Sequence, residues 1–303
     1  MSVMGKKKPK RFFIYLCFRV VGFFIYLLPL RIALLIGRCL GKLAFCTLKA
    51  EQKRILEHLD IAFGASKTLR QKIFITKGVF ENLGQNFVEV ISLSKFNSRN
   101  IDKYVECSGL QIVNRLIHKG KGGIVLSAHF GNWELLAHYF ALKGYSVNVI
   151  ARRVRNQYFE GFLERLRKRH RVNILHRDAS IKDVMSLLKK NEFVGIMPDQ
   201  DIDSIKGVFV DFFGKPAYTP NGPAILNRLT GASIIPCFIV RKKFGHKVMI
   251  EEPIELSKSG DRNKDMLENT IRCSKAIEDY IRKFPSLWVW FHERWKTQVS
   301  TKT

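Results

Sequence analysis

The stretch Gly-Gly-Ile-Val-Leu-Ser-Ala-His-Phe-Gly-Asn-Trp-Glu-Leu-Leu, residues 122–136, decides the fold of this chain. Its first half is a short apolar run with β-branched residues, which predicts a buried strand over 122–128. Asn132 can cap a helix that starts with Trp133, so a helix is predicted over 132–143. A strand that leads directly into a helix is the repeating unit of α/β sheets, which bind ligands at the carboxyl ends of their strands.

His129 and Glu134 fall at this strand-to-helix turn. In one continuous helix, positions five apart would be rotated by about 140°, so the imidazole must belong to the turn. A carboxylate bound to one imidazole nitrogen fixes the tautomer and stabilises the imidazolium. The pair therefore predicts a general base, His129, oriented by Glu134, an arrangement that suits activation of an alcohol. The alternative is a polar pair in which Glu134 only complements the helix dipole.

Two other chemistries fit this segment less well. Ser127 as a nucleophile would need a sharp Gly-x-Ser-x-Gly elbow, and the sequence there is Leu-Ser-Ala. A zinc site needs several convergent ligands, but His138 is the only nearby addition and no His-Glu-x-x-His pattern occurs. The sequence thus predicts no metal site, and the expected chemistry requires no organic cofactor.

Strand-like and helix-like segments alternate on both sides of this stretch, which favours an α/β fold with a largely parallel mixed sheet flanked by helices. The predicted strands cover 122–128, 146–151, 172–176, 193–198, 208–213, 233–241 and 246–251. The predicted helices cover 51–63, 68–93, 132–143, 156–169, 178–190, 221–230 and 263–284. Because no Pro/Gly/Ser-rich linker divides them, we expect one catalytic domain over 51–303 after a membrane-anchoring segment over 1–50.

Polar residues follow several of the predicted strands. Strand ends converge on one edge of a parallel sheet, so Arg152, Arg177, Asp199 and Gln200 could share a crevice with His129. Arginine suits phosphate and carbonyl recognition, and Asp199 could bind such an arginine or hold a loop through its backbone. Together with Asn132 they are candidates for binding substrate or stabilising an oxyanion. Ordinary solvated loops are the alternative.

The charge balance restricts the partners. The chain has 52 Lys and Arg against 26 Asp and Glu, a net charge of +26. Such a field attracts nucleic acid, an anionic bilayer, phosphorylated lipids or an acidic protein, unless it is only a solvated basic surface. No recognisable nucleic-acid-binding motif occurs. The six cysteines are scattered without a Cys-x-x-Cys pair, which fits reduced thiols in the cytoplasm.

The amino terminus favours a lipid among these partners. Lysines and Arg11 precede a 19-residue apolar run, 12–30, that contains one charge, Arg19. The run is nearly long enough to span a bilayer, although Arg19 would cost about 3 kcal/mol on insertion scales. We expect an anchoring helix followed by an interfacial one. A signal peptide would need a small-residue cleavage site, which is lacking, and a buried core helix is the other alternative.

His-Phe-Gly-Asn-Trp-Glu, 129–134, resembles the His-x4-Asp/Glu motif of acyltransferases in the form found in the bacterial lipid A late acyltransferases, the lauroyl/myristoyl transferase family. Further motifs follow in family order over 198–200, 212–217, 219–232 and 288–296, so the resemblance covers nearly the whole chain. The chain departs from the family where Arg152-Arg153 replaces a common Arg-Pro, and where His58-Leu59 replaces an early Asn-Leu.

The resemblance implies transfer of a fatty acyl group from an acyl-carrier protein thioester to a hydroxyl of a lipid A precursor, at the cytoplasmic face of the inner membrane. His129 would take the hydroxyl proton, Glu134 would orient His129, and backbone N–H groups or Arg152 would stabilise the oxyanion. The implied partners are acyl-carrier protein (or acyl-CoA), a phosphorylated glycolipid and the anionic membrane surface; nucleic acid is not expected. Two alternatives remain: the same chemistry on a phosphatidylinositol mannoside or lysophospholipid, and a non-catalytic protein that binds anionic membranes.

Overall fold

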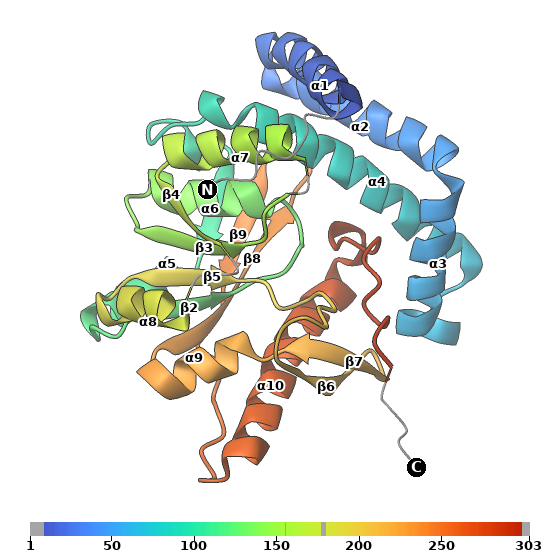
Figure 1. Ribbon diagram of the computed structural model, residues 1–303. Helices are drawn as coiled ribbons and strands as arrows, with labels where there is room; N and C mark the ends of the chain where they lie inside the picture. Colours follow the sequence, from blue (N-terminus) through green and yellow to red (C-terminus); the bar gives the residue numbers. More distant parts are fainter. Residues whose placement is uncertain (1–8, 155, 177–179, 299–303) are drawn as a thin grey trace.

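A seven-stranded sheet forms the centre of the computed structural model, which describes residues 9–154, 156–176 and 180–298 (Figure 1). The strand order is β1-β9-β8-β2-β5-β3-β4, and within the described strands of this sheet only β8 and β9 pair antiparallel. The strands are β1 Val105–Ser108, β2 Gly123–Leu126, β3 Val147–Ala151, β4 Val172–His176, β5 Phe193–Ile196, β8 Ser233–Arg241 and β9 His246–Ile250. The predicted largely parallel mixed sheet is confirmed.

Helices cover both faces of this sheet. They are α1 Pro9–Leu27, α2 Leu30–Thr47, α3 Lys49–Phe63, α4 Leu69–Ile91, α5 Leu110–His118, α6 Trp133–Leu142, α7 Gln157–Arg169, α8 Ile181–Lys189, α9 Gly222–Thr230 and α10 Arg262–Lys283. Four single 3-10 turns, Gly64–Ser66, Leu93–Lys95, Ile101–Lys103 and Pro285–Leu287, link some of them. A separate antiparallel hairpin, β6 Gly207–Phe212 and β7 Lys215–Pro220, packs against α10 (Figure 1).

Side-chain alternation along β8 divides the core into two layers. Successive side chains of a strand point to opposite faces, so Ile234 and Phe238 pack in the layer that contains α8, α9 and α10. Ile235 and Ile239 face the other way, into the layer of α5 and α6. Because β8 is central and covered on both faces, its sequence is apolar almost throughout. The strand therefore packs against both helical layers.

Glycines allow α2 to lie directly against α4. A Cβ at Gly37 or Gly41 would collide with backbone atoms of α4, and one at Gly84 would collide with the Gly37 carbonyl. Glycine is the residue that permits so close an approach of two backbones. A capping box of Thr68 and Gln71 fixes the start of α4. As a result the long helix α4 connects the amino-terminal helices to the sheet edge.

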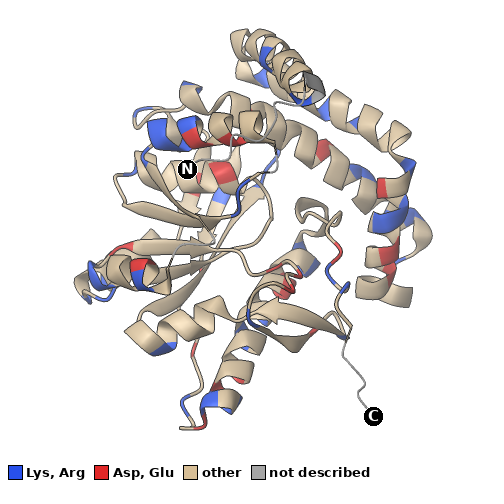
Figure 2. Cartoon of the chain, in the orientation of Figure 1, with Lys and Arg blue, Asp and Glu red and all other residues tan. Residues whose placement is uncertain are grey.

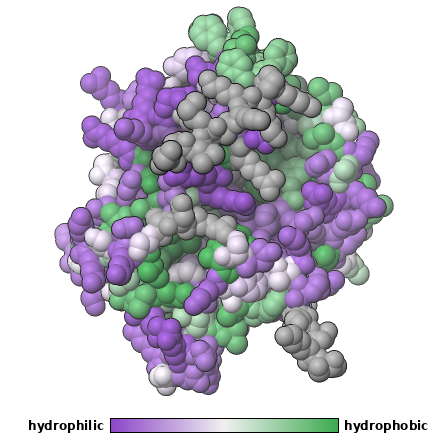
Figure 3. Space-filling view, in the orientation of Figure 1, coloured by the Kyte–Doolittle hydropathy of each residue, from purple (hydrophilic) through white to green (hydrophobic). Residues whose placement is uncertain are grey.

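The predicted membrane-anchoring helix is not supported. Among the described helices, none is both long and apolar enough to cross a membrane. The apolar run is broken near Pro29, where α1 ends and α2 begins, and α1 itself contains Arg11 and Arg19. Many apolar side chains of α1 and α2 are nevertheless exposed and form green patches at the top of Figure 3. We call this set the exposed apolar surface: Phe12, Phe13, Ile14, Leu16, Val20, Val21, Phe23, Phe24, Leu27, Ile32, Leu35, Leu40 and Leu43.

Three segments differ from the sequence prediction, one of them β7, which forms a strand where none was predicted. Residues 105–118 form a strand and a helix, β1 and α5, where no element was predicted. β1 has only four residues and acquires its place by pairing with β9 far along the chain, so its local pattern is weak. The strand predicted over 208–213 is present as β6, but it pairs with β7 outside the main sheet.

Candidate active site

The turn between β2 and α6 carries His129 at the carboxyl edge of the sheet, as predicted. β2 ends at Leu126 and α6 begins at Trp133. Gly131 has φ +58°, and a Cβ there would collide with the carbonyl oxygen of Ile239 on β8. The turn therefore requires glycine, because other residues rarely adopt that conformation and none would fit. This close approach fixes the backbone on which His129 stands.

Asp199 is the hydrogen-bond partner of His129. The Asp199 carboxylate accepts from His129 Nδ1 at 2.9 Å, from the His129 backbone N–H at 2.9 Å and from Trp288 Nε1 at 2.8 Å. An ionised carboxylate only accepts hydrogen bonds, so Nδ1 carries the proton and Nε2 has the free lone pair. The Asp199 side chain is 1% exposed and that of His129 24% exposed. His129 thus presents Nε2 as a base toward the solvent-accessible side of the turn.

The two partners shift each other's titration. Burial alone would lower the pKa of His129, but the Asp199 charge and hydrogen bond, with a contribution from Glu134, raise it above the ordinary value. Burial raises the pKa of Asp199, yet the imidazolium and the hydrogen bonds from His129 and Trp288 lower it to about 2. Asp199 is therefore ionised at neutral pH, and His129 is a stronger base than free imidazole.

Glu134 has a different partner from the one predicted. Its carboxylate accepts from Arg167 Nε at 3.0 Å and from Arg167 Nη2, and both side chains are mostly buried, at 13% and 15% exposure. The predicted hydrogen bond from His129 to Glu134 is thus wrong, because the end of β5 brings Asp199 to Nδ1 instead. Glu134 still acts on His129 through space, since its charge raises the pKa of the imidazole.

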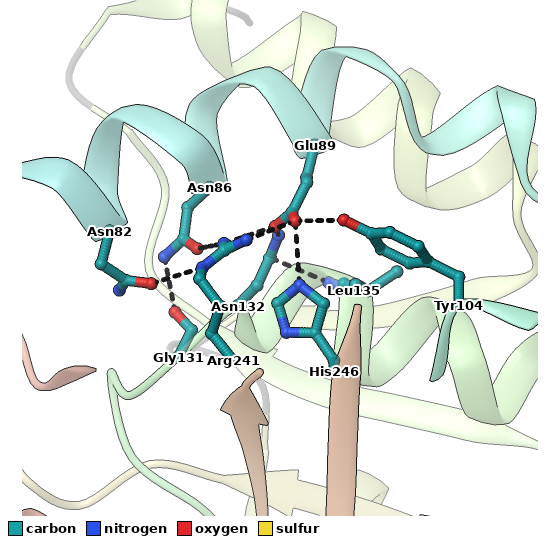
Figure 4. Close-up of polar contacts among 9 residues, drawn as sticks. All are labelled: Asn82, Asn86, Glu89, Tyr104, Gly131, Asn132, Leu135, Arg241 and His246. Atoms are coloured by element: carbon teal, nitrogen blue, oxygen red, sulfur yellow. Dashed lines mark hydrogen bonds and ion pairs between the residues drawn. The ribbon is translucent and has the colours of Figure 1, made fainter. Parts of the chain in front are cut away.

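A buried polar network around Glu89 forms hydrogen bonds with the turn that carries His129 (Figure 4). Glu89 on α4 is fully buried and accepts from Arg241 Nη1 at 2.6 Å and Nη2 at 2.7 Å, and it also bonds His246 at 2.9 Å. The network reaches the turn at two points. Asn86 Nδ2 donates to the Gly131 carbonyl at 2.5 Å, and Asn132 Nδ2 donates to Glu89 at 2.7 Å. Two of the six turn residues 127–132 are therefore bonded directly to this network.

Asn132 is the N-cap of α6 and not a surface for substrate. Its Oδ1 accepts from Leu135 N at 3.1 Å while its Nδ2 is used by Glu89, and the residue is 2% exposed. This corrects the predicted contact with substrate, because both polar atoms are engaged inside the protein. The backbone N–H groups of Trp133 and Glu134 have no hydrogen-bond partner among the described residues. Such N–H groups at a helix start can stabilise an oxyanion.

The other predicted site residues are distributed unevenly. Arg152 and Gln200 both line the cavity that contains His129, as expected from their strand ends. Arg177 lies outside the described residues. One group of metal-type ligands, Glu160, Glu164 and His176, occurs among the described residues, but none of its members lines that cavity.

Two cavities meet beside His129. The larger, about 1080 Å³, has a mixed lining that includes apolar residues and His129. Its charged residues are Arg54, Arg152, Arg167, Lys206 and Lys296 with Glu134, Asp201, Asp203 and Glu293. The smaller, about 110 Å³, lies between α6 and the sheet and is mostly apolar, with Val125, Val149, Phe193, Gly195 and Ile235 in its wall. Trp133, Glu134, Ile150, Ala151, Arg167, Ile196 and Met197 line both. The Glu134–Arg167 ion pair thus lies where the mostly apolar cavity meets the larger, mixed one.

Sequence reasoning missed the roles of Trp288 and Arg167. Trp288 holds Asp199 by its indole N–H, and an isolated β-bridge joins it to Phe130 beside the base. The carboxyl-terminal motif at 288–296 belongs to the resemblance, but its sequence does not indicate that Trp288 binds Asp199. Arg167 stands on α7 among several basic residues, so its pairing with Glu134 has no local signal.

Comparisons with known proteins show which chains this one is similar to. The profile of the bacterial lipid A biosynthesis acyltransferases matches residues 5–297. The chain is 27% identical to the lipid A biosynthesis lauroyltransferase of Escherichia coli (strain K12) over 274 residues, 89% of this chain and 87% of the relative. It is 26% identical to that organism's lipid A biosynthesis palmitoleoyltransferase over 274 residues, again 89% and 87% of the two chains.

A further relative has another name. The phosphatidylinositol mannoside acyltransferase of Mycobacterium tuberculosis (strain ATCC 25618 / H37Rv) is 25% identical over 229 residues, 73% of this chain and 70% of its own. These three relatives are named as acyltransferases, two of lipid A biosynthesis and one of phosphatidylinositol mannoside. The chain is an O-acyltransferase of the bacterial lipid A biosynthesis acyltransferase family.

Proposed function

We propose that the chain transfers a fatty acyl group from an acyl-carrier protein thioester to a hydroxyl of a phosphorylated glycolipid, a lipid A precursor. The observation that carries this proposal is the Asp199–His129 pair, whose imidazole lines a large cavity with charged and apolar walls next to a smaller, mostly apolar one. A base in this position suits a reaction that joins a sugar hydroxyl to an acyl chain.

The reaction begins with the acceptor hydroxyl against Nε2 of His129. The imidazole takes the proton as the oxygen attacks the thioester carbon, while Asp199 holds the ring and stabilises the imidazolium. The tetrahedral oxyanion then lies against the free N–H groups of Trp133 and Glu134. When the C–S bond breaks, the imidazolium returns its proton to the leaving thiolate, so His129 ends neutral. The residues require no covalent acyl-enzyme.

Each cavity has a part in this mechanism. The apolar cavity receives the acyl chain, because its wall offers mainly hydrocarbon and removing that chain from water is favourable. The larger cavity receives the glycolipid head: Arg54, Arg152, Lys206 and Lys296 would bind its phosphates, and the carboxylates Asp201, Asp203 and Glu293 of the same cavity would accept from its hydroxyls. Glu134 and Arg167 separate the two, so the ester bond forms at their boundary.

The enzyme acts at the cytoplasmic face of the inner membrane in this proposal. The exposed apolar surface of α1 and α2 would enter the bilayer interface, a mode of attachment that needs no spanning helix. Lys and Arg appear on α3, α7, α8 and α10 in Figure 2, so the positive charge is spread over the molecule. This charge supports attraction to anionic lipids and to an acidic carrier protein.

The direct test uses the full-length chain in mixed micelles with labelled acyl-carrier protein and a lipid A precursor. We expect acylated precursor from the wild type, identified by mass spectrometry, and no product from His129→Ala. His118→Ala, which removes an exposed histidine on α5 outside both cavities, is the matched control and should stay active. Transfer retained by His129→Ala at the wild-type rate would exclude the proposed base.

A second acceptor class remains open because one relative is named for phosphatidylinositol mannoside. The same assay discriminates the two when phosphatidylinositol mannoside and acyl-CoA are supplied in parallel. Preference for those substrates over the lipid A precursor and acyl-carrier protein would keep the mechanism and replace the acceptor.

A further inference from the structure

A groove between α1, α4 and α7 gathers arginines away from the active site. Its volume is about 520 Å³, and its lining includes Arg19, Arg165 and Arg169 but no acidic residue. The remaining lining is largely aromatic or aliphatic: Phe18, Phe23, Tyr26, Ile91, Phe162 and Leu166. None of these residues lines the cavity of His129. The groove is therefore a separate compartment with its own chemistry.

Two of the guanidinium groups converge on one oxygen. Arg19 Nη1 donates to the Tyr15 hydroxyl at 3.2 Å, and Arg165 Nη2 donates to the same hydroxyl at 3.3 Å. Aromatic packing of α1 on α7 keeps them together, since the Phe18 ring lies 5.3 Å from that of Phe162. Two like charges held on a neutral oxygen repel each other.

Arg169, the third arginine of the groove, adds another positive charge. Arg165 and Arg169 are four residues apart on α7, a spacing at which like charges are neighbours and destabilise a helix. Within the described part of the chain, neither these two nor Arg19 forms an ion pair with a carboxylate. Arg19 does lie 6.0 Å from the ring centroids of Tyr15 and Phe162, but these rings carry no negative charge to neutralise the three arginines. An anion bound in the groove would relieve their mutual repulsion.

The surroundings of the groove indicate what carries that anion. Its α1 wall continues into the exposed apolar surface, where Phe23 is 59% and Phe24 62% exposed. An occupant that has both an anionic group and an apolar part would use the groove and this surface together. Guanidinium groups match phosphate oxygens with paired N–H donors. The occupant that fits both features is a phospholipid whose phosphate enters the groove while its chains stay beside α1.

We propose that Arg19, Arg165 and Arg169 form a binding site for the phosphate headgroup of an anionic phospholipid. This site is distinct from the catalytic cavity, and it rests on the proposed position of α1 at the membrane but not on the proposed reaction. A bound headgroup bridges α1 and α7, so it also holds the amino-terminal helix against the catalytic domain.

The experiment measures binding of dihexanoyl phosphatidylglycerol, below its micelle concentration, to the full-length chain in a neutral detergent by calorimetry. We expect saturable binding of one lipid to the wild type. Arg165→Gln combined with Arg169→Gln should weaken it by roughly tenfold or more, since each arginine near an anionic headgroup contributes about a factor of five.

Matched controls separate a site from general surface charge. Arg31→Gln with Lys42→Gln removes the same charge from α2, which also carries part of the exposed apolar surface but does not line the groove. That variant should bind like the wild type. Equal losses in the two double variants, or no saturable binding by the wild type, would overturn the proposal.

Inorganic phosphate provides the last arm of the test. Binding of phosphate as tight as that of the lipid would show a free-anion site and also overturn the proposal. None of these measurements uses acyl transfer. A protein that bound the lipid but transferred no acyl group would therefore contradict the proposed reaction and not the proposed binding site.

Discussion

Asp199→Asn is the substitution that examines the catalytic pair most directly. The change preserves the size of the side chain but removes its charge, and an amide can donate its N–H to Nδ1 of His129. The imidazole proton would then move to Nε2, the atom that has to accept the proton of the acceptor hydroxyl. The variant should therefore fold while its base is held in the wrong tautomer.

The size of both effects follows from the contacts of Asp199. A wrong tautomer of a base oriented by a carboxylate lowers kcat by about 10⁴. The fall of the Asp199 pKa from 3.8 to about 2 corresponds to roughly 2 kcal/mol of stability at neutral pH. A lowered pKa contributes stability above about pH 4, and this contribution is lost as the pH falls through about 2. The variant should accordingly unfold several degrees earlier at pH 7 and match the wild type near pH 2.

The assay compares kcat for acyl transfer with thermal unfolding, and Asp265→Asn is the control. Asp265 on α10 also accepts from a backbone N–H, that of Ser259 at 2.8 Å, and from the hydroxyls of Ser257 and Ser259, but it lines neither cavity beside His129. It should lose stability but keep kcat within a factor of a few. Similar losses of kcat in both variants would attribute the effect to folding and refute the assignment of Asp199 as the orienter.

Three further predictions concern the surroundings of the pair. Asn86→Ala and Asn82→Ala each remove an acceptor of Arg241, but only Asn86 also binds the catalytic turn. Both variants should lose about 1 kcal/mol in the free energy of unfolding, while kcat falls mainly in Asn86→Ala. Equal kcat values in the two variants would contradict this. Gly195→Leu places a side chain in the apolar cavity and should reduce transfer of long acyl chains more than of short ones, measured with a donor series; an unchanged ratio would remove the cavity from the acyl path. Glu134→Gln leaves Arg167 mostly buried without its carboxylate, so it should lower the free energy of unfolding by about 3 kcal/mol. It should also move the midpoint of the pH profile of kcat/KM to lower pH, because the Glu134 charge raises the pKa of His129. An unchanged midpoint would show that the two groups are not coupled.

The strand-to-helix unit around His129 could be predicted because its signals are local. The apolar run forms β2, Asn132 caps α6, and the turn between them is short enough for a single stretch to define it. The same reasoning failed for β1, a four-residue edge strand whose partner, β9, lies about 140 residues away. Elements stabilised by distant pairing leave little trace in their own sequence.

The partner of His129 was mispredicted for a related reason. Glu134 is five residues away in sequence, whereas Asp199 is seventy residues away. The register of β2 and β5 pairs Leu126 with Ile196, and three residues beyond each of them stand His129 and Asp199. The correct partner therefore follows from strand order, since it lies directly across the sheet edge. Strand order is not readable from an alternating pattern of strands and helices.

This exchange of partners changes what the His-x4-Glu spacing means physically. If Glu134 held His129, one turn of the chain would contain the whole catalytic pair, and the pair could form without the sheet. With Asp199 as the partner, the base is oriented only when β5 pairs with β2 and Trp288 packs against the turn, so catalytic competence depends on three distant segments. Glu134 is then free to bind Arg167 at the boundary of the two cavities. The short motif thus places a base and a boundary residue at one helix start, and the rest of the fold supplies the orienting carboxylate.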